Sequence, residues 1–146
     1  MNGTHVITYD PYYRRSSVDL ALSEVAHESA FILSLNGYLL YAPGGGSNTL
    51  YVYDLSSGAN STYTLPEGVE PYTCTAYDPN NDIGYVLFGN TGDIYNLTIN
   101  ESGALVLRKA GLSPTALPVG LTFGNGLLWV ISKGAVSYTH LTLPTN

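Results

Sequence analysis

Charge is scarce in this chain of 146 residues: charged residues make up 11% of it, whereas about a quarter is usual. The net charge is −6, and the basic residues are Arg14, Arg15, Arg108, Lys109 and Lys133. They form no basic patch or stripe, which argues against nucleic acids or anionic membranes as partners. No apolar run reaches the length of a transmembrane helix, so we expect no membrane insertion by this segment.

Cysteine is almost absent as well. The single cysteine, Cys74, has no partner for a disulfide within the chain. It lies in a strand-like stretch, which favours a buried small apolar residue over a nucleophile.

Apolar residues and turn formers dominate instead. Hydrophobic residues account for 45% of the chain, with 13 tyrosines and 16 glycines. Aromatic and β-branched residues suit a pleated surface, and Gly and Asn suit turns. The composition therefore predicts an all-β fold with a core.

An internal repeat is the strongest signal in the sequence. Three segments align: "NGYLLYAPGG", "NDIGYVLFGN" and "GNGLLWVISKG". Their apolar runs begin at Tyr38, Ile83 and Leu127, which gives offsets of 45 (83 − 38) and 44 (127 − 83). Upstream, "THVITYD" matches "TLYVYDL" at nearly the same offset. The repeat also aligns two further sets of positions, Leu40 with Tyr85 and Trp129, and Tyr41 with Val86 and Val130.

Each period accommodates four short strands separated by Gly, Asn and Asp, as hairpin connections require. The stretch "LLYAPGGGSNTLYVYDLSSG" resembles a kelch repeat. The stretch "YTCTAYDPNNDIGYVLFGNTGDIYNLTINESG" is similar to the looser repeats of secreted bacterial propellers and lactonase-like proteins. The resemblance implies a partial β-propeller over residues 1–135, with about three four-stranded antiparallel blades in an open arc.

Two structural alternatives remain. The segment Ser16–Ala30 fits a strand near Val18–Leu22 followed by a loop, which the repeat favours, but a helical turn would also place Val18, Leu22 and Val25 on one face. Many short strands also suit a β-sandwich, although a sandwich does not require a fixed period.

The tail, residues 136–146, differs from the rest. "VSYTHLTLPT" resembles the translation of a transposase-end sequencing adapter, because GTC TCT TAT ACA CAT CTG ACG CTG CCG ACG encodes it residue by residue. We therefore expect a non-native tail, a reading frame cut inside a blade, and terminal blades with exposed apolar faces. His140 then leaves the set of possible ligands. The alternative is a genuine third strand.

Several polar groups are candidates for sites. Asp78 to Asp82 carries oxygens at alternate positions, as calcium loops do, but lacks the glycine and distal glutamate of that pattern and suggests a turn. Gly44 to Gly46 lacks the context of a phosphate loop and suggests a flexible hairpin loop. His5 and His27 have no nucleophile motif near them.

The carboxylates give no catalytic pair. Asp10 and Asp54 are related by the repeat and are expected to serve the same turn twice. Glu67 and Glu70 are expected to be solvated. The ends of the first strands carry oxygen-bearing side chains that a metal would accept, Asn36, Asp78 and Asn125, but only one is an acid. The sequence thus nominates no catalytic, metal-binding or cofactor-binding residue and no cofactor.

The functional prediction is an exported or cell-surface module that binds a protein or a glycan. Low charge, richness in Tyr, Thr and Asn, and the lack of a catalytic constellation favour it. The alternative is part of a propeller enzyme, a lactonase-like hydrolase or a glycan-active enzyme, with its site in other blades. A further expected partner is the remaining blades of a longer chain.

Overall fold

The computed structural model describes residues 4–133 and 140–142, and within them the protein is all-β, with no helix. The strands follow one another as β1 (His5–Asp10), β2 (Arg15–Ala21), β3 (Phe31–Leu35), β4 (Tyr38–Ala42), β5 (Thr49–Asp54), β6 (Asn60–Thr64), β7 (Cys74–Asp78), β8 (Ile83–Phe88), β9 (Asp93–Ile99), β10 (Leu105–Leu112), β11 (Pro118–Gly124), β12 (Leu127–Ser132) and β13 (His140–Thr142).

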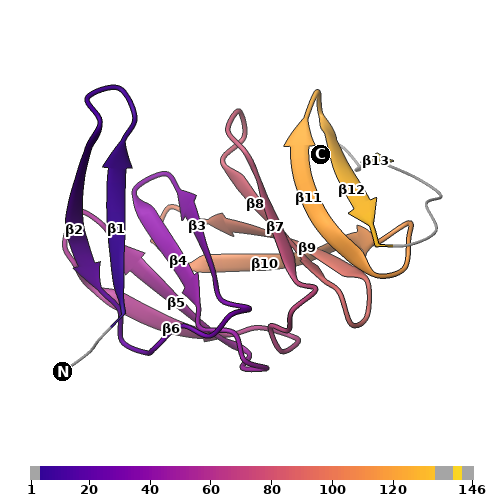
Figure 1. Ribbon diagram of the computed structural model, residues 1–146, viewed down its shortest axis with the longest axis horizontal. Helices are drawn as coiled ribbons and strands as arrows, with labels where there is room; N and C mark the ends of the chain where they lie inside the picture. The colour runs from indigo at the N-terminus through magenta and orange to yellow at the C-terminus, as the bar shows by residue number, and fades with distance from the viewer. Residues whose placement is uncertain (1–3, 134–139, 143–146) are drawn as a thin grey trace.

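The strands form a series of antiparallel sheets, each built from strands that are consecutive in the chain (Figure 1). Their orders are β1-β2, β3-β4-β5-β6, β7-β8-β9-β10 and β11-β12-β13. The first strands of successive sheets contact each other, β3 with β7 and β7 with β11. The β1–β2 sheet and the β11–β12 strands lie at opposite ends of the series (Figure 1).

The strand positions predicted from the repeat agree with the structure. The second strands β4, β8 and β12 begin at Tyr38, Ile83 and Leu127, where the apolar runs begin. The strand interpretation of residues 16–30 is confirmed by β2, and the helical alternative is wrong. The sandwich alternative is also wrong, because the described strands form four sheets and not two.

The hydrophobic cores lie between the sheets. One core joins the β3–β6 sheet to the β7–β10 sheet and includes Leu33, Leu50 and Leu97. A second joins the β7–β10 sheet to β11–β12. A third joins β1–β2 to the β3–β6 sheet. Among the described residues, each core is shared by two sheets, so each sheet is stabilised by its neighbours.

Side chains alternate between two such cores along each central strand, as the pleat requires. In β4, Leu40 and Ala42 belong to the core shared with the β7–β10 sheet, and Leu39 and Tyr41 belong to the core shared with β1–β2. We name the side of a sheet that is turned toward the next sheet along the chain its forward face, and the opposite side its backward face. Strands covered on both faces explain the nearly continuous apolar runs.

Part of the expected non-native tail is a strand. β13 pairs with β12, with His140 opposite Trp129 and Thr142 opposite Leu127. Residues 136–139 and 143–146 lie outside the described part. Ladder pairing uses backbone groups that every non-proline residue carries, so it does not distinguish an adapter-derived tail from a native strand. Among the described residues there is also no helix with the length and apolarity to cross a bilayer.

Candidate functional site

The repeated carboxylates close turns. Asp10 Oδ1 accepts hydrogen bonds from the backbone N–H groups of Tyr12 (2.9 Å) and Tyr13 (3.2 Å). Asp54 Oδ1 accepts from the backbone N–H (2.9 Å) and the hydroxyl (2.7 Å) of Ser56. These bonds hold the pKa of Asp54 below its usual value. The prediction that Asp10 and Asp54 serve the same turn twice is confirmed.

Asp78 also closes a turn, as the sequence predicted for this loop. Its carboxylate is buried and accepts from the N–H groups of Asn80 (2.9 Å) and Asn81 (3.3 Å) and from the Asn81 side-chain amide (2.9 Å). Asp82 faces elsewhere: its Oδ1 accepts from Tyr77 Oη at 2.7 Å and from the N–H of Asn36 at 2.9 Å. The loop therefore links two sheets through Asp82.

The glycine run connects β4 to β5 as a tightly packed loop. All three glycines have positive φ, between 66° and 86°. The Gly45 N–H donates to Ser29 Oγ (2.7 Å), and the Gly46 N–H donates to the Val69 carbonyl (2.9 Å). These amides are therefore occupied and do not cradle a phosphate. The expected loop is present, but its hydrogen bonds to Ser29 and Val69 fix it against neighbouring segments. The expectation of a flexible loop is therefore wrong.

The histidines and the cysteine offer no nucleophilic arrangement. His5 and His27 are both exposed and lie on different segments, β1 and the β2–β3 loop. Cys74 packs against the core between the β7–β10 sheet and β11–β12. Burial raises the pKa of its thiol, which favours the unreactive protonated form. Its predicted role as a small apolar residue agrees with this position.

The ends of the first strands lie in separate turns. The Asp78 carboxylate is bonded within its own turn, the backbone N–H of Asn36 donates to Asp82 Oδ1, and Asn125 has a φ of 53° in the turn between β11 and β12. Across residues 4–133 and 140–142 there is no group of three or more His, Cys, Asp or Glu side chains that could hold an ion.

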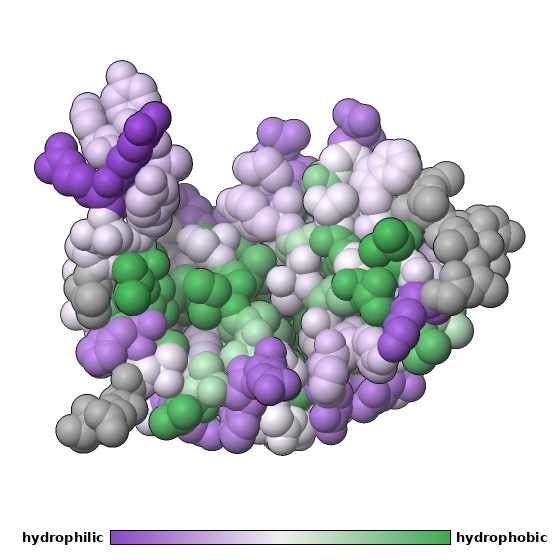
Figure 2. Space-filling view, in the orientation of Figure 1, coloured by the Kyte–Doolittle hydropathy of each residue, from purple (hydrophilic) through white to green (hydrophobic). Residues whose placement is uncertain are grey.

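The turn between β1 and β2 carries a cluster of exposed aromatic and basic side chains, which we name the tyrosine tip: Tyr12, Tyr13, Arg14 and Arg15. The Tyr12 and Tyr13 side chains are 83% and 62% exposed. Their rings meet edge to face with centroids 4.8 Å apart, and the Arg15 guanidinium lies 5.2 Å from the Tyr13 centroid. The hairpin rises above the neighbouring strands β3 and β4 (Figure 1), and it stands out as a protrusion at the upper left of the surface (Figure 2).

A shallow groove adjoins the tip. Its volume is about 510 Å³, and it is lined by Thr8, Tyr9, Asp10, Tyr13, Arg15, Ser16 and Ser17. The hydroxyls of Thr8 and Ser17 are hydrogen-bonded across the hairpin at 3.0 Å. Aromatic rings, a cation and hydroxyls thus converge on one accessible surface. Sequence reasoning missed this surface, although the letters "DPYYRR" between two strands carried the signal.

A second groove, of about 810 Å³, lies where β3 meets the β7–β8 turn. Its lining includes Ile32, Ser34, Asn36, Tyr77 and Asp82. Tyr77 and Asp82 are hydrogen-bonded to each other, and this bond raises the pKa of Tyr77. The lining includes no cation and no histidine that could activate the hydroxyl of Ser34, so the groove has few groups suited to catalysis.

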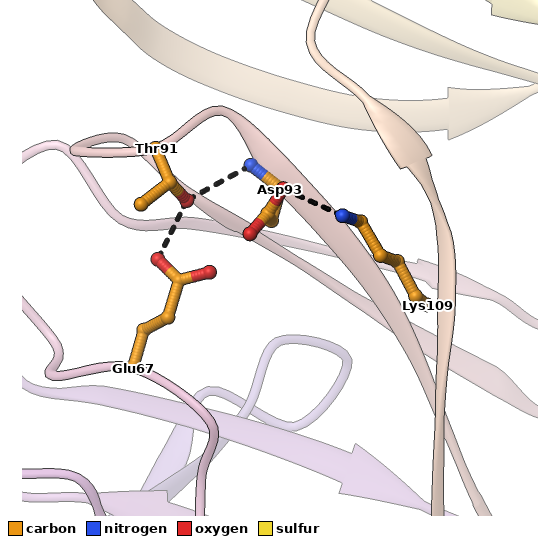
Figure 3. Close-up of polar contacts among 4 residues, drawn as sticks. All are labelled: Glu67, Thr91, Asp93 and Lys109. Atoms are coloured by element: carbon orange, nitrogen blue, oxygen red, sulfur yellow. Dashed lines mark hydrogen bonds and ion pairs between the residues drawn. The ribbon is translucent and has the colours of Figure 1, made fainter.

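Two carboxyl groups lie together on the sheet β7–β10 (Figure 3). Thr91 Oγ1 donates to Glu67 Oε1 at 2.6 Å, and the Asp93 N–H donates to Thr91 Oγ1 at 3.2 Å. Lys109 Nζ lies 3.1 Å from Asp93 Oδ1. Glu67 comes from the β6–β7 loop, so this cluster joins a loop to strands β9 and β10. Glu67, predicted to be solvated, is partly exposed, and its carboxylate is also bonded to Thr91.

The pKa values of Glu67 and Asp93 are shifted in opposite directions. Burial, followed by a hydrogen bond with Asp93, raises the pKa of Glu67. The hydrogen bonds from Glu67 and Lys109 lower the pKa of Asp93. Protonation is therefore favoured at Glu67 over Asp93. Oppositely shifted carboxyls are also what general acid–base chemistry uses.

No protein-family model matches the chain, and no curated protein is similar to it. The fold thus defines the class alone: an all-β protein of consecutive antiparallel sheets.

Proposed function

We propose that the sheets are successive blades of a partial β-propeller in an open arc, and that the chain is a binding module for a protein or a glycan, exported or on the cell surface. Consecutive strand order within each sheet, cores between sheets and contacts between the first strands support the arrangement. The low charge and the resemblance to secreted repeats support the location.

The tyrosine tip is the observation that carries the binding proposal. Tyr12 and Tyr13 expose large rings at the end of a hairpin, where no core requires them. Tyrosine contributes contact area with few rotatable bonds, and its hydroxyl forms hydrogen bonds at the edge of a contact. Tyrosine and arginine are enriched among the residues that dominate binding energy. Both occur here, with Arg15 placed against Tyr13.

The test is a binding screen with the 146-residue chain against immobilised glycans and against extracellular proteins of its source. A ligand found there should bind the double variant Tyr12→Ser/Tyr13→Ser at least about tenfold more weakly, because hot-spot aromatics each contribute more than about 1 kcal/mol. Leu55→Ser is the matched control, since Leu55 is 53% exposed in the corresponding turn after β5. Equal binding by the double variant and the wild type would contradict the proposal.

A second candidate function is hydrolysis of a glycan or a lactone, favoured by the oppositely shifted pair Glu67 and Asp93. Glu67 would act as the acid and Asp93 as the base. Turnover of a chromogenic glycoside or lactone by the wild type, lost in Glu67→Gln, would support it. Turnover that persists in the variant would exclude this pair as its source.

A further inference from the structure

The groove between β3 and the β7–β8 turn has a lining that suits the binding of a ligand. Its volume of about 810 Å³ lies in the usual range of small-molecule pockets, about 300–1,000 Å³. Its described lining residues all come from the β3–β6 and β7–β10 sheets and their turns, and each of these sheets has four strands. The groove is therefore a feature of the interface between two neighbouring four-stranded sheets.

Asp82 occupies a turn position that glycine holds in the other two periods. It directly precedes the second strand β8, as Gly37 precedes β4 and Gly126 precedes β12. All three residues have positive φ: 80° at Gly37, 55° at Asp82 and 76° at Gly126. A left-handed backbone is unstrained for glycine but costs energy for a residue with a Cβ atom. Such strain clusters at functional positions, which makes the Asp82 carboxylate a candidate functional group.

Only one oxygen of this carboxylate is used within the described chain. Oδ1 accepts from Tyr77 Oη at 2.7 Å and from the backbone N–H of Asn36 at 2.9 Å. These donors come from two different sheets, so together they fix the orientation of the carboxylate. No described residue is hydrogen-bonded to Oδ2. The groove therefore contains a fixed acceptor that a ligand can use.

The remaining lining supplies hydrogen-bonding groups beside an apolar surface. The side chains of Ser34 and Asn36 are exposed and form no hydrogen bond to another described residue. A hydroxyl and an amide both donate and accept. Ile32 is 50% exposed, and Pro79 is exposed as well. Asp82 is the only charged residue among the described lining residues. This combination matches a sugar ring, which has hydroxyls around its edge and apolar C–H groups on its faces.

We propose that this groove binds a neutral glycan, with a sugar hydroxyl donating to Asp82 Oδ2 and the C–H face of the ring packing on Ile32 and Pro79. The inference rests on the proposed function in taking a glycan as ligand, but it uses residues outside the tyrosine tip. An acidic sugar would be repelled by Asp82, since no cation is present in the described lining. The two hydrogen bonds to Oδ1 offset part of the negative charge, which favours a hydroxyl over an ammonium group as the partner.

Titration of the isotope-labelled chain with neutral trisaccharides of glucose, galactose, mannose and N-acetylglucosamine, followed by its amide signals in NMR spectra, tests the proposal. At least one trisaccharide should bind and shift the signals of Asn36, Tyr77 and Asp82. Trigalacturonic acid, which has carboxylates in place of the hydroxymethyl groups of galactotriose, should bind at least about tenfold more weakly than the best neutral sugar. Trilysine, as a cationic peptide, should do the same.

Two variants separate the role of Oδ2 from the structural role of Asp82. Asp82→Asn keeps one oxygen for Tyr77 and Asn36 and replaces the other by an amide, so binding should weaken at least about tenfold. Asp54→Asn makes the same change in a turn outside the groove and should bind like the wild type. Asp82→Gly restores the residue of the other two periods, so it should fold, as a circular dichroism melt would verify, and should show the same loss of binding.

The proposal would be overturned if no neutral trisaccharide bound, or if trigalacturonic acid or trilysine bound more tightly. Binding that persisted in both Asp82 variants would also overturn it. The tip variant Tyr12→Ser/Tyr13→Ser should bind the trisaccharide like the wild type. If that variant alone lost the sugar, the groove would be excluded while the proposed function of the tip stood. Conversely, a tip without any ligand would leave the result for the groove unchanged.

Discussion

At the scale of single residues, one device recurs: a short oxygen-bearing side chain caps the turns that follow strands β1, β5 and β9. Asp10 and Asp54 do this after β1 and β5, and Asn100 does it after β9, where its Oδ1 accepts from the N–H (3.0 Å) and the hydroxyl (2.7 Å) of Ser102. Asx side chains favour such turns because they replace a backbone acceptor. Repeated acids of this kind therefore have a structural explanation.

The pair Glu67 and Asp93 predicts a specific pH dependence of stability. Folding raises the pKa of Glu67, so its contribution is present below the ordinary glutamate value and is lost as pH rises through the raised value. Folding lowers the pKa of Asp93, so its contribution is present above the ordinary aspartate value and is lost as pH falls through the lowered value. Both contributions coexist only near the ordinary values, at about pH 4.

The variant Glu67→Gln isolates the Glu67 part, because an amide does not ionise and its oxygen can still accept the hydrogen bond from Thr91 Oγ1. As pH rises from about 4 to about 8, the Tm of the wild type should fall relative to that of the variant. Glu101→Gln, in an exposed turn, controls for the loss of one charge. A Tm difference between wild type and Glu67→Gln that is constant with pH would contradict the assignment.

At the scale of elements, close approach between sheets depends on a glycine in the second strand. A Cβ added to Gly84 of β8 would lie 2.4 Å from Leu33 Cδ2 of β3. Leu33 is buried in the core between these two sheets, so it has little room to move. The β3–β6 and β7–β10 sheets are therefore held at a spacing that only glycine permits at this position.

Gly84→Ala should lower the free energy of unfolding by about 1–3 kcal/mol, the usual range for overpacking a core. Gly124→Ala in β11 is the matched control, since its nearest atom would be Trp129 Nε1 at 3.8 Å. It should change stability by less than about 1 kcal/mol. Urea denaturation midpoints would measure both. Equal effects at the two positions would show that the sheet spacing adapts.

The positions of the strands could be predicted from the sequence. The polar cluster around Glu67 and Asp93 could not. The runs from Tyr38, Ile83 and Leu127 became β4, β8 and β12 because strands covered on both faces need continuous apolar residues. Glu67 and Thr91, 24 residues apart, meet only when the β6–β7 loop folds across the next sheet. No local pattern encodes that contact. The packing of the glycine run against Ser29 and Val69 has the same long-range origin.

At the scale of the whole molecule, the described sheets are held together by the hydrophobic cores between neighbours. Each core needs residues from two sheets, so removing a sheet exposes the apolar faces of both neighbours. Architectures of this kind have stabilities that approximate a sum of unit and nearest-neighbour terms. In the described chain, the exposed faces of β1 and β12 each lack one nearest-neighbour term.

The cores between sheets also bear on how such a chain can change over generations. Tandem duplication of one whole period, with its second strand in phase with Tyr38 and Ile83, adds a sheet whose two faces already fit the existing neighbours. An insertion of a single residue within a strand instead turns its apolar side chains to the wrong face. Duplication of a whole period therefore disturbs the packing less than gradual lengthening of the strands, and it would produce a regular spacing such as the offsets of 45 and 44 residues.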